Sequence, residues 1–445
     1  MAGLRHVWYG DDFTGASDTL ATLAGAGLRT MLFLGVPSPR HLEAAGPLDA
    51  LGIAGAARAM SPAAMEAELA PVGRFLASLR APVLHYKCCS TFDSSPTVGS
   101  LGAALRILKR DVRNDFVPVV GGQPSLGRYC AFGNLFASTG GGGLAYRIDR
   151  HPTMSRHPVT PMQEADLRRH LALQGLDSVA LVDLITLAGS DDDALEAAID
   201  AVLADGPDAV LFDVTDATHL ARIGSVVWRR ARRAPLLALG ASSVAQALLA
   251  HWRNTGELGE PDTTATVLPA EGPVFVLAGS QSPVTASQIE ATRRVRDGAS
   301  PLFECVAIDA DSIIGQAAAL EALARTCADI LDRGRGVLAH TTPVRDGGPA
   351  ALEVAAACGR LLANVLTIAP HVRRAGVAGG DSSSLAVQAL GGWALSHAGT
   401  LAPGVALTRL HSDAPSLHGL ELMLKGGQMG PPDLFERLVR GGRYD

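Results

Sequence analysis

Short runs of β-branched and apolar residues alternate with longer helical patterns along the whole chain of 445 residues. Strands separated by helices indicate βαβ units, in which parallel strands are buried on both faces. We therefore expect an α/β fold. Helices are expected over 191–204 and 314–332, among others. The expected strands are 6–9, 30–34, 83–86, 117–120, 179–182, 209–212 and 236–239 in the first half, and 274–277, 303–308, 337–340 and 376–378 in the second.

The length of the chain exceeds what one hydrophobic core usually supports, so two domains are expected. A polar stretch rich in Gly, Pro, Thr and Glu, residues 254–269, has the composition of a linker. The sequence therefore predicts domains 1–255 and 270–445, each a mostly parallel sheet flanked by helices. The glycine-rich tract 138–143 is expected to be a flexible excursion within the first domain.

Charge and cysteine usage exclude several classes of protein. The formal net charge is −6, which gives no basic surface for nucleic acid or an anionic membrane. The six cysteines are scattered and form no CxxC pair, so neither a zinc site nor a disulfide framework is expected. The N-terminus enters a strand-like run without a signal region, and no uninterrupted apolar stretch could span a bilayer. The simplest predicted location is the cytoplasm.

An acidic turn, Gly10 to Thr19, follows the first expected strand and opens a helix expected to run to about Gly27. Ligands sit at the carboxyl ends of parallel strands, where a helix N-terminus presents unpaired N–H groups. Of the adjacent Asp11 and Asp12, one can cap the helix while the other binds hydroxyls or accepts a proton. The structural alternative is that these acids, with Asp18, are only capping or solvated groups.

A second polar turn follows the expected strand 83–86. Lys87 offers a positive charge for a carboxylate, and Ser90 and Thr91 offer hydroxyl donors beside it. An ordinary lysine next to a Ser/Thr turn is the structural alternative. Cys88 and Cys89 lie between these groups and are interpreted as packed small residues, because the sequence shows no paired base for a nucleophile.

Three glycine-rich turns follow expected strands in the second half: Ala278 to Ser282, Gly379 to Ser384, and Leu424 to Gly430. Glycines let the backbone approach a phosphate closely, and Asp381 or Ser382 is expected to cap the following helix. Lys425 would add a positive charge within its loop. By contrast, the run from Gly122 to Tyr129 is not a P-loop, because Arg128 stands in place of the lysine.

Taken in order, these motifs resemble the four-carbon acid sugar kinase family, nearly from end to end. The family's Asp-Asp-x-Thr-Gly-Ala-x-Asp turn is matched from Asp11 to Asp18, and its Lys-x-x-Ser-Thr segment by Lys87, Ser90 and Thr91. Three further family turns are matched in the second half, at Gly279-Ser280, at Gly379 to Ser382, and at Lys425, Gly427 and Gly430. One departure lies at residues 92–95, where an arginine and a glycine of many family members are replaced.

The resemblance implies a sugar-acid-binding N-terminal domain and an ATP-binding C-terminal domain. Asp12 is the first candidate to orient or deprotonate the acceptor hydroxyl, and Asp381 is the rival. The metal ligands are left open. The substrate contacts implied or favoured are Asp11, Asp12, Arg58, Lys87, Cys88, Cys89, Ser90 and Thr91. The nucleotide contacts are Ser280, Gly379, Gly380, Asp381, Ser382, Lys425 and Gly427.

The expected activity is phosphoryl transfer from ATP, with Mg²⁺, to a hydroxyl of a tetronate, a 3-oxo-tetronate or a related branched oxo-acid. The expected partners are therefore a small sugar acid and ATP, without nucleic acid or membrane, and a homodimer is one open assembly. Two alternatives are a non-catalytic sensor and a dehydrogenase. A non-catalytic sensor of the same fold would bind both ligands without turnover. A dehydrogenase would need a dinucleotide fingerprint, which the sequence lacks.

Overall fold

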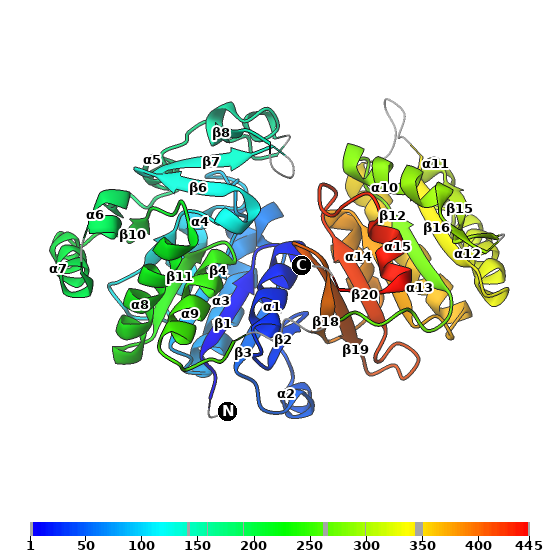
Figure 1. Cartoon of the computed structure of the whole chain (residues 1–445), viewed down its shortest axis with the longest axis horizontal. Helices are drawn as coiled ribbons and strands as arrows, with labels where there is room; N and C mark the ends of the chain where they lie inside the picture. Colours follow the sequence, from blue (N-terminus) through cyan, green and yellow to red (C-terminus); the bar gives the residue numbers. More distant parts are fainter. Residues whose placement is uncertain are drawn as a thin grey trace. The chain divides into compact units, whose positions relative to one another are not determined.

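The computed structural model describes residues 3–139, 143–157, 159–189, 191–260, 266–298, 300–342 and 350–443. The chain divides into two compact units, Met1–Pro261 and Asp262–Asp445 (Figure 1). The expected linker 254–269 and the expected excursion 138–143 both include residues outside these ranges. Each unit is built on a mostly parallel sheet flanked by helices, so the predicted α/β class is confirmed.

The first unit contains a wholly parallel sheet in the order β2-β3-β1-β4-β11-β5-β10-β9. Its central strands are buried along their whole length, which explains their continuous apolar sequences. The strands are β1 (His6–Gly10), β2 (Thr30–Phe33), β3 (Ala50–Ala54), β4 (Val83–Lys87), β5 (Pro118–Val120), β9 (Val179–Val182), β10 (Ala209–Phe212) and β11 (Leu236–Gly240).

Helices cover both faces of this sheet. α1 packs on α9, and α8 also packs on α9, whereas α3 packs on α4. The α-helices are α1 (Phe13–Gly25), α2 (Pro39–Ala45), α3 (Pro62–Ser78), α4 (Leu101–Leu108), α5 (Leu167–Ala172), α6 (Leu184–Gly189), α7 (Asp192–Leu203), α8 (Ala217–Arg233) and α9 (Ser243–Asn254). Short 3₁₀ turns occur at η1 (Ala57–Ala59), η2 (Pro124–Leu126), η3 (Ile148–Arg150) and η4 (Met154–Arg156).

The direction in which successive strands are added to this sheet reverses between the neighbouring parallel strands β1 and β4. From β1 the chain passes through α1 to β2 on one side, and from β4 it passes through α4 to β5 on the other. Because such crossovers are right-handed, α1 and α4 lie on opposite faces and leave a crevice at the carboxyl ends of β1 and β4. Both polar turns of the first half begin at this point.

A small antiparallel sheet, β6-β7-β8, is inserted between β5 and β9 and was not expected from the sequence. Its strands are β6 (Arg128–Ala131), β7 (Asn134–Ser138) and β8 (Ala145–Arg147). The buried carboxylate of Asp213, just after β10, accepts hydrogen bonds from the backbone N–H groups of Phe132 (2.6 Å) and Gly133 (2.9 Å). These bonds fix the β6–β7 turn beside the end of the main sheet.

The second unit has the strand order β15-β16-β12-β17-β20-β19-β18, parallel from β15 to β20 and antiparallel from β20 to β18. A core that includes Val276, Leu338, Phe435 and Leu438 packs around it. The strands are β12 (Val274–Ala278), β15 (Phe303–Ile308), β16 (Gly336–Thr341), β17 (Arg374–Ala378), β18 (Ala394–Ala402), β19 (Val405–His411) and β20 (Glu421–Lys425), beside a small ribbon of β13 (Arg296–Asp297) and β14 (Ser300–Pro301).

In this sheet, too, the direction in which successive strands are added reverses, between the neighbouring parallel strands β12 and β17. From β12 the chain crosses through α10 to β15, and from β16 it returns through α13 to β17. α10 contacts α15, whereas α13 contacts both α12 and α14, so the two sets of helices cover opposite faces. The helices are α10 (Pro283–Arg294), α11 (Ala310–Ile313), α12 (Ala317–Asp332), α13 (Ala351–Ile368), α14 (Gly380–Ala389) and α15 (Leu434–Arg440).

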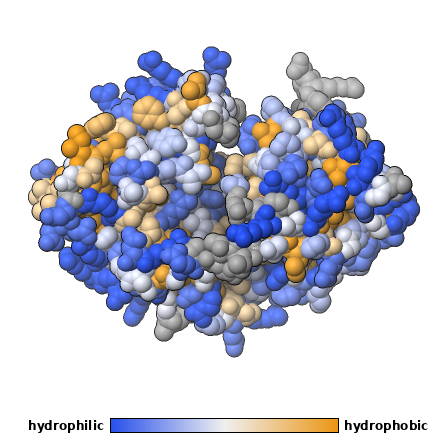
Figure 2. All heavy atoms as spheres, viewed as in Figure 1, coloured by the Kyte–Doolittle hydropathy of each residue, from blue (hydrophilic) through white to orange (hydrophobic). Residues whose placement is uncertain are grey.

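α13 is the one helix, within the described part of the chain, that is long and apolar enough to cross a bilayer by length and composition. Half of it is buried inside the unit, and Glu353 and Arg360 interrupt its apolar sequence. Its contacts with α12 and α14 are those of a core helix. Elsewhere on the surface, Figure 2 shows apolar side chains over α5 and α6, where Leu173 and Ile185 are exposed.

Candidate active site

Four charged side chains gather where β1 and β4 end. Asp11 and Asp12 follow β1, Lys87 is the last residue of β4, and Arg58 lies on η1. Arg58 Nη1 lies 2.9 Å from Asp12 Oδ2, and Arg58 Nη2 lies 3.5 Å from Asp11 Oδ1. Lys87 Nζ lies 3.8 Å from Asp12 Oδ1. The structure thus brings together the residues that the two polar turns singled out.

The turn that carries these acids is fixed by its own backbone. Asp12 is the N-cap of α1, and its Oδ1 accepts a hydrogen bond of 2.8 Å from the Gly15 N–H. The Asp11 N–H donates to the Lys87 carbonyl at 2.9 Å, and the Arg58 N–H donates to the Asp11 carbonyl at 3.0 Å. Three segments distant in sequence are therefore held in register at the site.

Gly15 makes the close approach of Lys87 to Asp12 sterically possible. A Cβ atom at this position would lie 1.7 Å from Lys87 Nζ and 2.4 Å from Asp12 Oδ1. Such contacts cannot be relieved without moving one of the two charged groups. A side chain at position 15 would therefore change the positions of the charged groups of the site.

The two acids differ in exposure and in pKa. Asp11 is 2% exposed, whereas the side chain of Asp12 is 26% exposed. Burial raises the pKa of Asp11 to about 6, although Arg58 acts in the opposite direction. Burial also acts to raise the pKa of Asp12, but Arg58 and Lys87 outweigh it and hold that pKa below the ordinary value. Asp12 is therefore the more exposed carboxylate, and it ionises at a lower pH than Asp11.

The remaining predicted substrate residues form a tight turn after β4. Cys88 and Thr91 are buried, and Cys89 and Ser90 are partly exposed. Thr91 Oγ1 donates to Asp93 Oδ1 at 2.5 Å and lies 3.0 Å from Cys89 Sγ. Burial raises the pKa of both thiols, which fits their interpretation as packed residues and not nucleophiles.

This turn adopts a strained backbone that neighbouring side chains stabilise. Phe92 has a φ of +53°, which is unusual for a residue with a side chain. Its carbonyl accepts a hydrogen bond from Ser94 Oγ (2.9 Å) and lies 3.1 Å from His170 Nε2. Gln174 Nε2 donates to Ser94 Oγ at 2.8 Å, so α5 and the residues after it support the turn. Neither His170 nor Gln174 was identified from the sequence.

Three buried polar atoms of the charged cluster and the first turn of α1 lack a hydrogen-bond partner among the described residues. They are Asp11 Oδ1, Thr14 Oγ1 and Arg58 Nε. Buried polar groups are rarely left without partners, because desolvation then goes uncompensated. Their position beside Asp12 favours a ligand that carries hydroxyl and carboxylate oxygens.

In the second unit, three glycine-rich turns meet at the carboxyl ends of β12, β17 and β20. The N–H groups of Gly279 and Ser280 both donate to the Ala378 carbonyl at 3.0 Å, and the Gly379 N–H donates to the Lys425 carbonyl at 2.9 Å. A Cβ on Gly279 would lie 2.3 Å from Ser382 Oγ. The three turns therefore form one continuous backbone surface.

The third turn is fixed by side chains from α10. Ser282 Oγ donates to the Gly427 carbonyl, as does Thr285 Oγ1 at 3.1 Å. A Cβ on Gly427 would lie 2.4 Å from Ser280 Oγ, so a larger residue there would have to displace that hydroxyl group. Ser282 also caps α10 through the Thr285 N–H, leaving the first turn of that helix at the same edge.

Lys425 is the last residue of β20 and is fully buried. Its ammonium group donates to Thr285 Oγ1 (3.1 Å) and to the carbonyls of Gly426 (3.1 Å) and Gly427 (3.2 Å). Burial lowers its pKa to about 8. Lys425 thus holds the glycine loop in place, with a positive charge directly beneath it.

The cap expected at α14 is different in the structure. Gly379, with a φ of +131°, is the N-cap, and no side chain makes a capping bond. Asp381 lies within the first helical turn and is exposed, whereas Ser382 is buried against Gly279. The prediction that Asp381 or Ser382 caps the helix is therefore wrong, because the glycine conformation starts the helix two residues earlier. The Asp381 carboxylate is consequently free to meet a ligand.

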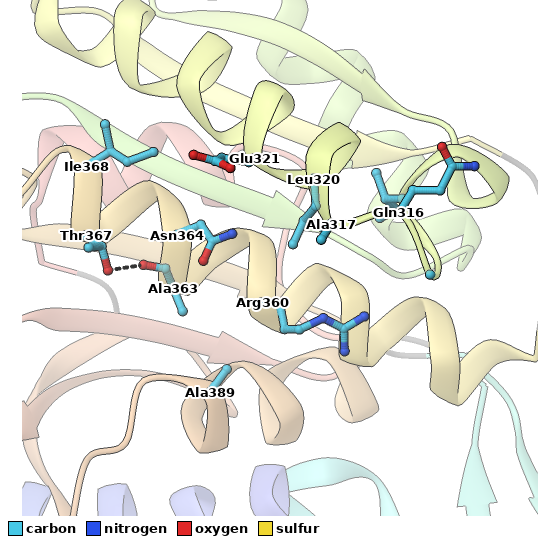
Figure 3. A pocket seen from close by; sticks show the side chains of 12 residues that line it. Gln316, Ala317, Leu320, Glu321, Arg360, Ala363, Asn364, Thr367, Ile368 and Ala389 are labelled. Atoms are coloured by element: carbon cyan, nitrogen blue, oxygen red, sulfur yellow. Dashed lines mark hydrogen bonds between the residues drawn. The ribbon is translucent and has the colours of Figure 1, made fainter.

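A groove of the second unit lies elsewhere (Figure 3). It has a volume of about 870 Å³ and runs between α12 and α13, with Leu320, Arg360 and Asn364 among its lining residues. None of the described residues of the three glycine turns lines it. This groove is therefore separate from the three glycine turns at the strand ends.

Two family models match this chain in succession. A sugar-binding N-terminal domain matches residues 6–248, and a nucleotide-binding C-terminal domain matches residues 275–435. A 3-oxo-isoapionate kinase of Paraburkholderia graminis is 41% identical, over 99% of this chain and 95% of the relative. The chain belongs to the four-carbon acid sugar kinase family. A 3-oxo-tetronate kinase of Cupriavidus necator is 32% identical, over 97% of this chain and 95% of the relative.

Membership of the four-carbon acid sugar kinases confirms the predicted family and the predicted kinase activity. Solved structures confirm the fold. A protein of Salmonella typhimurium LT2 aligns with a TM-score of 0.79 at 24% identity, over 99% of each chain. A protein of Haemophilus influenzae aligns with a TM-score of 0.73 at 24% identity, over 97% of this chain and 98% of the other.

Several residues of this kinase that support the two sites were not found from the sequence. Asp93 and His170 lie behind the turn that follows β4, and Thr285 and Gln288 support the third glycine turn. Gln288 Nε2 contacts the carbonyls of Met429, Gly430 and Pro431 at 3.0–3.1 Å. For the three helical residues, His170, Thr285 and Gln288, the only signal in the sequence is that a polar residue interrupts an apolar helix face.

Proposed function

We propose that this kinase transfers the γ-phosphoryl group of ATP to a hydroxyl of a 3-oxo sugar acid. A branched acid of the 3-oxo-isoapionate type is the first choice, and 3-oxo-tetronate the second, in the order of the 41% and 32% identities. The observation that carries the proposal is the partly exposed Asp12 carboxylate, held between Arg58 and Lys87 at the carboxyl ends of β1 and β4.

Asp12 would act on the acceptor hydroxyl. Because its pKa is held below the ordinary value, it is a weak base and is ionised at neutral pH. A weak base suits phosphoryl transfer, whose loose transition state needs the attacking oxygen positioned before its proton leaves. Asp12 would accept the hydrogen bond of the hydroxyl, orient its oxygen, and take the proton as the O–P bond forms.

On the nucleotide side, the turn residues Ser280 and Gly379 to Ser382 are candidates to bind the phosphates. The N–H groups of Ser280 and Gly379 already donate to carbonyls, so the amides in the first turn of α14, from Gly380 to Ser382, are the ones available to a ligand. Glycine turns at helix N-termini suit such groups because their unpaired amides and helix dipoles favour negative charge. Lys425 would add its charge from below Gly427. Phosphoryl transfer then requires the acceptor hydroxyl to meet the γ-phosphate, with Asp381 as the second candidate for a role at that group.

Mg²⁺ is expected to accompany ATP, and the residues present fit such an ion. Mg²⁺ is usually bound by one or two carboxylates together with substrate phosphates. Asp381 offers one exposed carboxylate beside the glycine turn, and the described residues contain no cluster of three acidic, histidine or cysteine side chains. When bound, the ion would neutralise charge on the phosphates. Cytoplasmic location and a homodimer stay predictions.

The proposal is tested by incubating the protein with MgATP and a panel of four- and five-carbon aldonic and 3-oxo acids, including branched ones. Release of ADP is measured for each acid. We expect turnover highest with branched 3-oxo acids and no nucleotide consumption without an acid. Release of ADP that is independent of the acid would contradict the proposal.

The same assay separates the two candidate carboxylates. We expect Asp12→Asn to lower kcat by about 10²-fold or more, because general-base and positioning groups contribute about that much. Asp49→Asn is the control, since Asp49 pairs with Arg29 at the amino end of β2. If both Asp12→Asn and Asp381→Asn leave turnover intact, the assignment of either residue to the reaction is wrong.

A further inference from the structure

Arg128, the first residue of β6, has a guanidinium group that is fixed on one side only. Its Nη1 donates to three backbone carbonyls, those of Leu126 (2.9 Å), Gly127 (3.3 Å) and Ser138 (3.2 Å). These contacts tie the group to the small sheet and set its orientation. The edge formed by Nε and Nη2 has no hydrogen-bond partner among the described residues, and Nε is buried.

The charge of Arg128 is not neutralised by any described acidic side chain. No carboxylate of the described chain pairs with it, and burial lowers its pKa, opposed only by the weakly acidic Cys89 and Tyr129. Most other partly buried arginines of the first unit are paired, as Arg58 is with Asp12 and Arg230 is with Glu196. A half-buried, unpaired cation with an unused donor is costly, which indicates that an anion completes the site.

Arg128 lies at the same sheet edge as the acidic turn. Its backbone pairs with Gln123, through N–H to carbonyl bonds of 2.9 and 3.2 Å in the two directions. Gln123 follows β5, and its Nε2 reaches Asp18 of α1 at 3.5 Å. Cys89, which follows β4, is also close enough to act on the charge of Arg128. Arg128 is therefore linked to α1 through Gln123, and it lies in the neighbourhood of Cys89, one of the proposed substrate contacts.

The charge balance of that site decides which cation is available for a carboxylate. Arg58 and Lys87 face three acids, since Asp11, Asp12 and Asp93 all act on the Arg58 charge. Two like charges about 4 Å apart repel by about 4 kcal/mol where the effective dielectric constant is about 20. A substrate carboxylate placed on Arg58 or Lys87 would meet this repulsion. Arg128 has no such neighbour among the described acids.

We propose that Arg128 binds the carboxylate of the sugar acid through the Nε and Nη2 edge of its guanidinium group. The planar fork of arginine matches a carboxylate in a bidentate arrangement, which a lysine cannot provide. Lys87, which the sequence favoured for this role, would instead hold Asp12 with Arg58. The inference rests on the proposed function, because it takes the substrate to be an acid.

The test compares each acid with its neutral amide, which keeps the hydroxyls but lacks the charge. For Arg128→Gln we expect the KM of the acid to rise about 100-fold, as expected for loss of a charge-assisted, bidentate hydrogen bond. The KM of ATP and the weak turnover of the amide should not change. Arg128→Lys should raise the KM of the acid about 10-fold, because it keeps the charge and loses the fork.

Arg168→Gln is the matched control, since Arg168 pairs with Asp166 beside the same small sheet. Its acid KM should equal that of the wild type. The inference is overturned if Arg128→Gln keeps the acid KM within about threefold, or if acid and amide lose activity equally, as a purely structural role predicts. Should Arg128→Gln not fold, Arg128→Lys decides by the same two criteria. Failure of wild-type protein to phosphorylate any acid would instead refute the proposed function.

Discussion

Lys87 Nζ lies 3.8 Å from Asp12 Oδ1, in space that is open only because Gly15 has no side chain. This relationship joins the end of β4 to the first turn of α1. The Lys87 charge helps to hold the pKa of Asp12 low, and so keeps this carboxylate ionised. Asp12 is the carboxylate that is proposed to meet the acceptor hydroxyl. The absence of a side chain at Gly15 therefore allows the position of Lys87 which, together with Arg58, keeps the pKa of Asp12 low.

We expect Gly15→Ala to lower kcat/KM for the sugar acid by about 10²-fold, because the new Cβ must displace Lys87 or Asp12 from the productive geometry. Steady-state kinetics with the acid varied measures the effect. Gly25→Ala is the matched control. Gly25 lies in the same helix, α1, and a Cβ there would meet no atom within 4 Å. Equal kinetics of the two variants would show that the close approach does not matter.

Most of the fold could be predicted because buried parallel strands have continuous apolar sequences. The expected strands 83–86 and 236–239 correspond to β4 and β11, which are buried at every position. The antiparallel β18 was missed, since five consecutive residues in its middle are only partly buried. β8 was missed because all of it is exposed. Neither strand has the strict alternation that identifies a half-buried strand.

The candidate site was predictable to the extent that it follows strand ends. Asp12 and Lys87 each come directly after an apolar run, so parallel pairing brings them together. The sequence only excluded Arg128 from a P-loop. The proposal for Arg128 rests on the absence of a carboxylate partner among the described residues, which is a property of tertiary structure. The start of α14 was misplaced because the sequence does not reveal the positive φ of Gly379.

The buried Lys425 predicts a pH dependence of nucleotide binding. With a pKa of about 8, its ammonium group loses its charge as the pH rises past 8. We expect the KM of ATP to rise above pH 8, while the KM of the sugar acid does not follow it. Lys425→Met should show a high ATP KM without this dependence. A wild-type ATP KM that is constant from about pH 7 to 9.5 would contradict the role given to Lys425.

Asp11 predicts a pH dependence of stability. Its folded pKa of about 6 lies above its ordinary value of 3.8, so ionisation disfavours the folded state as the pH rises from 4 to 6. The penalty is absent below pH 4 and reaches about 3 kcal/mol above pH 6. The free energy of unfolding is measured with urea at several pH values for wild type and Asp11→Asn. As the pH rises from 4 to 6, the value for Asp11→Asn should increase relative to that of the wild type. A difference independent of pH would refute the assignment.

The support of the turn after β4 can be tested at Gln174. Its Oε1 accepts the Leu101 N–H at 2.7 Å, and its Nε2 donates to Ser94 Oγ at 2.8 Å. Gln174→Ala leaves buried groups without partners, so we expect the free energy of unfolding to fall by about 2 kcal/mol. The acid KM should rise as the turn loosens. Gln246→Ala, which removes an exposed hydrogen bond to Ser125, should change neither quantity.

Phosphorus NMR of the reaction with MgATP and a branched 3-oxo sugar acid tests the central claim most directly. The account predicts a new phosphomonoester signal that grows in step with ADP in the wild type and is strongly reduced in Asp12→Asn. Formation of inorganic phosphate in place of the monoester, or an unchanged monoester signal in Asp12→Asn, would contradict it.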